Sequence, residues 1–326
     1  MLPLTPITIP DYSSLAKQPT LLTEEPMLTV TILTIAARYM RMTGARSNSR
    51  PHAIHHKLWS YLQGMINRLV WGQERFDNDL SNAGADIDPY SRKGLRTMGT
   101  VESLMLLTEW HPRSLHFPPD DDDTELMLND MAPKTDVEDV NADAAKGIGG
   151  QRIDTWLRPA WKSDRICWMQ LSMANALAFE IGVFDENTTR HLQYMTPEKR
   201  HAYETRRLHT KSLLLAYTTQ TSGRLGIASM MPQMHSEPSL SEYFENRLQY
   251  PTTKDLVIHL FLRIAAIIKA GNRDLFPNRQ RTREIIHNGQ YRDLLQSIHP
   301  GLAAWKTDFE RAKNSKSRRT VTRAGH

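Results

Sequence analysis

The sequence predicts an all-α protein, an irregular multi-helix bundle with long loops, one of which is strongly acidic. Three observations support this fold class. Apolar residues recur at every third or fourth position in successive segments, which is the spacing of one helix face. The alternating valine- or isoleucine-rich runs that indicate strands are missing. The 326 residues, 40% hydrophobic and 24% charged, suffice for a large buried core.

The N-terminal part predicts an irregular lead-in followed by three helices. Residues 1–24 are rich in Pro, Thr and Ser, which is typical of irregular structure. The first helix follows Pro26, and its apolar face comprises Leu28, Ile32, Ile35, Tyr39 and Met42. The corresponding faces of the next two helices comprise Leu58, Leu62, Met65 or Ile66, and Leu69, then Met98, Val101, Leu104, Met105 and Thr108. We expect a loop over roughly residues 77–93, between the second and third helices.

The third helix should end within the stretch TEWHPRSLHFPPDDDD, residues 108–123. Because Pro112 disfavours helical geometry at His111, the helix should stop near Trp110. Trp110 should pack at this corner, and Glu109 and Arg113 should bond helix-end groups or each other. The five residues Glu109, Trp110, His111, Pro112 and Arg113 are therefore predicted to form a structural motif, and not a catalytic mouth.

Four further helices are predicted downstream. Residues 166–183 are apolar nearly all round, which indicates a helix buried deep in the bundle. Thr196, Pro197 and Glu198 predict the start of a helix that runs to about Thr221 and stops near Gly223. The next helix should be capped by Thr252 or Thr253 and stop at Gly271, with a stripe of Val257, Phe261, Ile264 and Ile268. A last helix with Leu294, Leu295 and Ile298 should close before Pro300.

The charges are segregated along the chain. The net charge is +5, but residues 120–143 hold ten acidic residues and one basic residue, a net charge of −9, which leaves +14 for the remainder. We expect residues 120–150, part of a loop over 117–152, to be mobile and to bind neither Mg²⁺ nor Ca²⁺ tightly. The basic remainder either attracts polyanions or is a solvated surface. The predicted organisation is a lead-in at 1–24, a helical domain at 25–310 and a basic tail at 311–326.

No catalytic, cofactor-binding or metal-binding residue is predicted, and we do not expect an enzyme. P-loop, dinucleotide and nucleophile-elbow motifs are missing. The acidic residues Asp121, Asp122 and Glu125 loosely match the magnesium motif of all-α prenyl-diphosphate enzymes, but Pro118 and Pro119 place them in a turn. An all-α metal-dependent enzyme that uses the acidic loop is the alternative.

Histidine and cysteine residues point to structural roles. His52 and His56 have the spacing of a zinc pair, but the glutamate that a metalloprotease needs between them is missing, so His52, His55 and His56 are expected to form local hydrogen bonds. Cys167 is the only cysteine, which excludes a disulfide within the chain and a multi-cysteine zinc site. No apolar run reaches the length of a membrane span.

Four apolar residues on one predicted helix have two open interpretations. Trp161, Trp168, Met169 and Phe179 either pack in the core or form walls of a ligand pocket between helices.

Several long segments resemble a known family. They are GTVESLMLLTEWHPRSLHFPP (99–119), WLRPAWKSDRICWMQLSMANALAFEIGVFDE (156–186) and RRLHTKSLLLAYTTQTSGRLGIASMMP (206–232), with MLTVTILTIAARY and IHHKLWSYLQGMINRLVWGQERF upstream. Their order is similar to that of the regulatory, or middle homology, region of fungal zinc binuclear-cluster transcription factors, and they cover most of residues 25–232.

The resemblance implies an all-helical regulatory domain of a nuclear, gene-specific RNA polymerase II transcription factor. Its partners would be the transcription machinery or co-regulator proteins, with a small-molecule effector as a further candidate and no membrane. Zinc and DNA contact belong to the family's six-cysteine module, which this chain cannot build with Cys167 alone. The chain is then either a fragment or a member without the zinc cluster. A transcriptional interaction protein without DNA contact is a further alternative.

Overall fold

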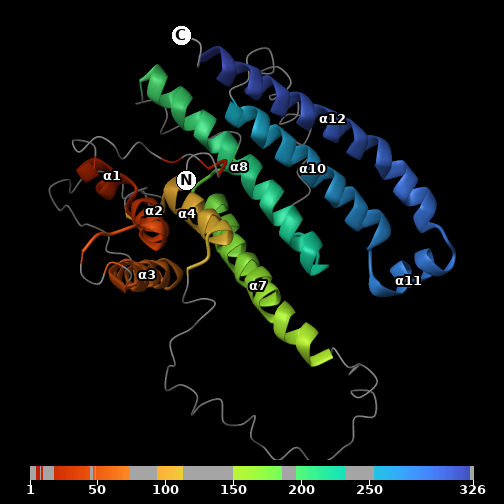
Figure 1. Cartoon of the computed structure of the whole chain (residues 1–326), viewed down its shortest axis with the longest axis horizontal. Coiled ribbons are helices and arrows are strands. Elements are labelled where there is room, and N and C mark those ends of the chain that lie inside the picture. The colour runs from red at the N-terminus through yellow and green to blue at the C-terminus, as the bar shows by residue number, and fades with distance from the viewer. Residues whose placement is uncertain are drawn as a thin grey trace, which may run out of the picture.

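The computed structural model describes residues 5–7, 9, 18–44, 47, 49–73, 94–112, 150–185, 196–231 and 253–323. Every regular element in these ranges is a helix, which confirms the all-α prediction (Figure 1). The helices are α1 (Gln18–Glu24), α2 (Pro26–Tyr39), α3 (Ser49–Val70), α4 (Met98–Glu109), α7 (Gly150–Glu180), α8 (Pro197–Leu225), α10 (Thr253–Leu275), α11 (Arg279–His287) and α12 (Tyr291–Arg323). No helix in the described part is long and apolar enough to span a membrane. The predicted loop at 77–93 and most of the acidic loop lie outside the described residues.

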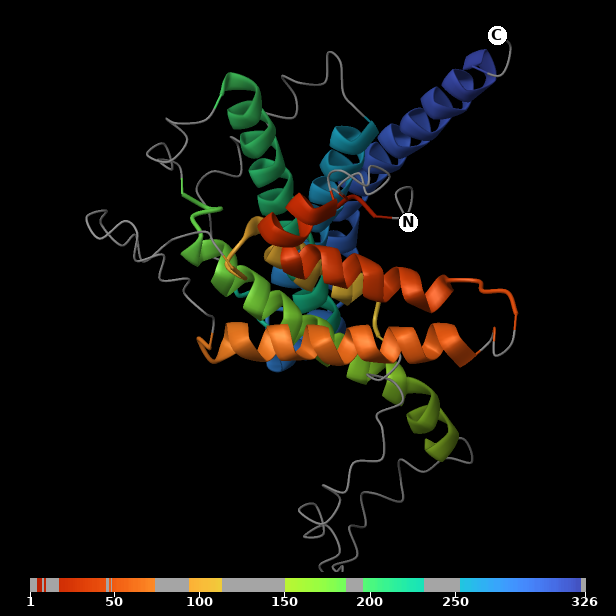
Figure 2. The ribbon, with the colours of Figure 1, turned by 90° about the vertical axis from the view of Figure 1, so that its left-hand side faces the viewer.

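Helix α4 lies at the centre of the core. Its residues from Met98 to Leu107 are all buried, because α2, α7 and α8 pack against it. Thr97 caps its N-terminus by accepting a 3.2 Å hydrogen bond from the Thr100 amide. Helices α2 and α3 pack against each other and lie across one side of the core (Figure 2). The residues of α3 buried in the core include Trp59, Leu62, Met65 and Leu69.

The C-terminal helices add successive layers on the other side. Helix α8 packs on α7 and on α10, and α10 in turn packs on α12 (Figure 1). Helix α12 is therefore the outermost of the three, and its far end extends beyond the body of the molecule (Figure 2). The order α4, α8, α10, α12 places the C-terminal segment far from the central helix.

Several predicted helix ends are wrong. Helix α1 lies within the predicted irregular lead-in, and α2 ends at Tyr39, so Met42 lies beyond the helix. Helix α8 continues past Gly223 to Leu225 and is capped by Gly226 in the left-handed region (φ 65°). Gly271 lies inside α10, where α12 packs nearby. At Gly223 and Gly271, tertiary packing outweighs the local tendency of glycine to end a helix.

Pro300 does not end the last helix either. Helix α12 runs from Tyr291 to Arg323 through Pro300, so the segment predicted as a basic tail is helical to Arg323. Pro300 removes one backbone hydrogen bond. Contacts with α10 hold both sides of it, and one is the 2.9 Å hydrogen bond from Trp305 Nε1 to the Leu260 carbonyl.

Two predicted apolar faces also differ from the observed ones. Trp59, not Leu58, is fully buried at the start of the α3 face. In α7, Leu171, Ala174 and Ala178 are buried, while Met169 on the same helix is exposed. Among the described helices, α4 and α8 make the main contacts with α7. Apolar residues on the rest of its surface, such as Met169, are therefore exposed.

Two helix-interior glycines give a matched test of packing. A Cβ on Gly223 would lie 2.3 Å from Asn272 Nδ2 and 3.2 Å from Ile268 Cγ2, where α8 and α10 touch, whereas a Cβ on Gly64 would meet nothing within 4 Å. We expect Gly223→Ala to lower the free energy of unfolding by about 1–3 kcal/mol, and Gly64→Ala to raise it by about 0.5–1 kcal/mol. Urea denaturation measures both, and equal effects would contradict this account of the α8–α10 contact.

Candidate functional site at the end of helix α4

Helix α4 ends at the predicted place. Trp110 is its C-cap, and its amide donates a 2.8 Å hydrogen bond to the Leu106 carbonyl. Pro112 follows two residues later and is buried. The chain leaves the helix here because the residue before a proline is pushed out of helical geometry.

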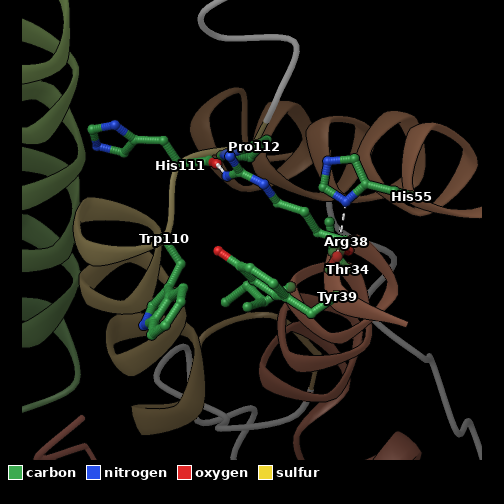
Figure 3. A pocket seen from close by; sticks show the side chains of 8 residues that line it. Thr34, Arg38, Tyr39, His55, Trp110, His111 and Pro112 are labelled. Carbon is green, nitrogen blue, oxygen red and sulfur yellow. Dashed lines mark hydrogen bonds between the residues drawn. The ribbon is translucent and has the colours of Figure 1, made fainter. Parts of the chain in front are cut away.

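The Trp110 ring contacts the end of α2. It lies edge-to-face against Tyr39, with ring centroids 5.7 Å apart, and it packs on the core from a half-buried position (Figure 3). Arg38 Nη1 donates a 2.6 Å hydrogen bond to the His111 carbonyl. On the same side, His55 of α3 donates from Nδ1 to the Thr34 carbonyl at 2.8 Å. The corner therefore ties α4 to α2 beside the contact between α2 and α3.

The His111 ring ties the same corner to α7. Its Nδ1 is hydrogen-bonded to Ser163 Oγ at 3.0 Å, and its Nε2 lies 3.3 Å from Cys167 Sγ. The thiol of Cys167 donates to the Thr108 carbonyl at 3.5 Å. Burial raises the pKa of this thiol, so it stays protonated near neutral pH. The arrangement is suited to holding α7 in place, and the raised pKa of the thiol disfavours the thiolate that a nucleophilic cysteine–histidine pair requires.

Glu109 faces the opposite side, toward α8. Its carboxylate accepts a hydrogen bond from Tyr217 Oη. Loss of water raises the pKa of Glu109, and burial together with the Glu109 carboxylate raises the pKa of Tyr217. The sequence did not predict Tyr217 as a partner of Glu109, and the predicted bond between Glu109 and Arg113 stays a prediction. Arg113 lies outside the described residues.

A pocket of about 170 Å³ lies beside this hydrogen bond, between α4, α7, α8 and α10. It is lined by Thr108, Glu109, Cys167, Tyr217, Gln220, Thr221, Arg224 and Phe261. Arg224 forms a 3.1 Å ion pair with Asp164. The pocket has apolar and ionic walls, but its volume is below the roughly 300–1,000 Å³ usual for drug-sized ligands.

The four apolar residues predicted as pocket walls or core do not line this pocket. Trp161, Met169 and Phe179 are exposed, and Trp168 is half-buried. Phe179 stacks on Phe184 with ring centroids 4.4 Å apart. The structure brings Cys167, from the same helix, to the pocket instead.

A buried ionic cluster lies at the other end of α4. Arg206 of α8 donates to both carboxylate oxygens of Glu102, at 3.0 Å from Nε and 2.6 Å from Nη2, and also to Glu25 at 2.7 Å. Glu25 accepts hydrogen bonds from Thr97 Oγ1 at 2.7 Å and from the Gly99 amide at 3.1 Å. Its carboxylate therefore also stabilises the N-terminus of α4. Burial raises the pKa of Glu102 despite Arg206, while the two carboxylates raise the pKa of Arg206 and keep it charged.

Sequence reasoning missed this ionic cluster. One signal was available, because Glu102 lies in the apolar run GTVESLMLL and a buried carboxylate requires a partner. A second buried pair joins His209 Nε2 to Asp255 Oδ1 at 2.8 Å and links α8 to α10. These pairs hold helices together at the core.

The predicted metal-ligand candidates are dispersed where they are described. His52 and His56 are exposed on α3, whereas His55 is buried and bonded to Thr34. Within the described ranges, no three His, Cys, Asp or Glu side chains are grouped to hold a metal ion. Asp121, Asp122 and Glu125 lie outside these ranges, so the acidic loop stays a prediction.

One curated protein is similar over nearly the whole chain. It is named Transcription factor hmgR, from Aspergillus fumigatus, and it is 31% identical over 312 residues, which is 94% of this chain. The chain spans 39% of that protein's length. No family model matches the sequence. No solved structure matches it either.

Proposed function

We propose that this chain is the helical regulatory region of a fungal gene-specific transcription factor, and that it has no enzymatic activity of its own. The similarity over 94% of the chain to a protein named as a transcription factor carries this proposal. The all-helical fold is in keeping with it. The resemblance of the segments 99–119, 156–186 and 206–232 adds the zinc binuclear-cluster family and a nuclear location to the proposal.

The buried polar groups favour a regulatory over a catalytic role. His111, Cys167 and Arg206 connect helices to one another, and each is engaged in bonds that serve packing. A regulatory domain needs such ties, because a signal is transmitted through packed helices that hold a defined arrangement. Co-regulators or the transcription machinery would be its partners. A small-molecule effector would have to be smaller than a drug-sized ligand to fit the pocket of about 170 Å³ beside Tyr217.

A reporter assay in a fungal cell tests the proposal. The chain is inserted between an unrelated sequence-specific DNA-binding domain and an activation segment, and expression is read from a gene carrying the matching operator. We expect the insertion to change expression by about ten-fold, a coupling of about 1–3 kcal/mol. A flexible linker of equal length serves as the control. Expression equal to that of the linker control would contradict a regulatory role.

We also predict that the chain alone does not recognise a specific DNA sequence. Sequence readout needs side chains held at base edges by a rigid element, and a six-cysteine module cannot be built from Cys167. The remainder, with a net charge of +14, can still contact phosphates weakly, and such binding is lost steeply with salt. Selection from random duplexes near physiological salt measures this. Enrichment of one motif at sub-micromolar affinity would refute the prediction.

A further inference from the structure

Helix α12 uses one side to pack on α10. Half-buried residues mark this inner side at steps of three, four or seven residues, including Leu294, Ile298, Trp305 and Asp308. Trp305 is fixed by its hydrogen bond to Leu260, and Asp308 pairs with Arg263 of α10. The rest of the helix faces outward along the edge of the molecule (Figures 1 and 2).

An apolar row lies next to this inner side. Leu295, Leu302 and Phe309 are 51%, 44% and 42% exposed. They are spaced by seven residues, or about two helical turns, and therefore lie on one face of α12. Phe309 stacks on Trp305 with ring centroids 5.4 Å apart, which gives the row a fixed end. Three large apolar side chains in line on a helix are a form of surface that binds another helix.

A basic row runs beside the apolar row at the same interval. Its members, Arg292, His299, Lys306 and Lys313, are all exposed. Each lies three or four residues from a member of the apolar row, which is the distance of neighbours on a helix surface. Glu310 is the one carboxylate of α12 on this side between Arg292 and Lys313. By its position in the helix, Asp293 lies on the side of α12 away from the apolar row, and Asp308 forms an ion pair with Arg263.

We propose that the apolar row and the basic row together bind an amphipathic helix of a partner protein, one whose apolar face is bordered by acidic residues. The apolar row supplies anchors at helical spacing. The basic row selects acidic over basic partners and favours their approach. A second copy of this chain fits less well, because it would bring the same basic row with only Glu310 to oppose it.

Peptide binding to the full chain tests the partner chemistry. The probe is a fluorescent synthetic peptide of three heptads, with leucine on one face and glutamate on the flanks. One matched peptide has lysine in place of glutamate, and another has serine in place of leucine. Fluorescence polarisation should show binding of the acidic amphipathic peptide that weakens as salt rises, and binding at least about ten-fold weaker for each matched peptide.

Paired variants locate the binding surface. We expect Leu302→Ser with Phe309→Ser, and separately Lys306→Glu with Lys313→Glu, to weaken binding of the acidic peptide about ten-fold or more. The control variants Phe276→Ser and Arg283→Glu change one exposed apolar residue and one exposed cation at or next to α11, and they should bind as the parent chain does. Circular dichroism verifies that each variant keeps its helices.

Three outcomes would overturn the proposal. The first is that the lysine peptide binds as tightly as the acidic peptide. The second is that neither the double variant in the apolar row nor the one in the basic row weakens binding of the acidic peptide. The third is that the parent chain sediments as a dimer, which Leu302→Ser with Phe309→Ser converts to a monomer. The last outcome would assign the surface to a second copy. The binding assay involves no gene expression, so its failure is separate from a failure of the reporter assay.

Discussion

Replacing Arg206 by methionine should lower the free energy of unfolding by about 3–5 kcal/mol, because it leaves a buried carboxylate without its counter-charge. The Glu102 side chain is only 3% exposed, and Arg206 reaches both of its oxygens. The same change leaves Glu25 bonded to Thr97 and Gly99, so the main cost falls on Glu102. Denaturation in urea, with helicity as the signal, measures the loss.

The loss should depend on pH, and its sign follows from Glu102. Burial raises the pKa of Glu102 in the folded chain above its ordinary value of 4.5, and removing Arg206 removes the largest opposing effect. A carboxyl group whose pKa is higher in the folded than in the unfolded chain stabilises the fold at low pH. This contribution is lost as the pH rises through the pKa of the folded chain. We therefore expect Arg206→Met to be less destabilising at pH 5 than at pH 7. Adding Glu102→Gln should recover stability at pH 7 and remove this pH dependence.

An exposed ion pair supplies the control for this prediction. Arg281 and Glu284 lie one helical turn apart on α11, with side chains 51% and 44% exposed. Arg281→Met should change stability by less than about 1 kcal/mol, since water screens such pairs. Two results would contradict this prediction: Arg206→Met lowers the free energy of unfolding no more than Arg281→Met does, or it lowers it equally at pH 5 and pH 7. Either result would show that the change does not leave Glu102 as an unpaired buried charge.

The sequence predicted the helices more reliably than their ends. Apolar spacing is sufficient to predict α2, α3, α4 and α10, because a helix must bury one face whatever its neighbours are. Helix α8 is predicted from the capping signal of Thr196, Pro197 and Glu198. Gly223, Gly271 and Pro300 were misread as ends, because their local tendencies are outweighed by contacts among α8, α10 and α12. Such contacts join residues far apart in the chain, so a local pattern does not contain them.

The same limit applies to the candidate site. Pro112 was sufficient to predict where α4 ends, because its effect on His111 is local. The partners of that corner are not local: Tyr217 is 108 positions from Glu109, and Cys167 is 56 positions from His111. The exposed positions of Trp161 and Met169 were also outside the reach of a pattern, because the coverage of α7 depends on where α4 and α8 lie.

Truncation of Trp110 should be the second largest loss, about 3 kcal/mol on Trp110→Ala. The ring is half-buried, packs on the core and meets Tyr39 edge-to-face, so its removal opens a cavity at the place where α4 contacts α2. Trp110→Phe keeps an aromatic ring at this contact and should lose about half as much. Thermal and urea denaturation measure both variants.

Trp161→Ala is the matched control for the corner, because this tryptophan lies on α7 with half of its surface exposed. It should cost less than about 1 kcal/mol, as for other substitutions away from the core. If the corner at Glu109–Pro112 is structural, Trp110→Ala lowers stability while Trp161→Ala barely does. Equal losses, or a melting temperature unchanged by Trp110→Ala, would show that this corner does not hold α2 and α4 together. His111→Ala would then be the remaining test of the tie to α7, since it removes the bonds to Ser163 and Cys167 without altering the contact with Tyr39.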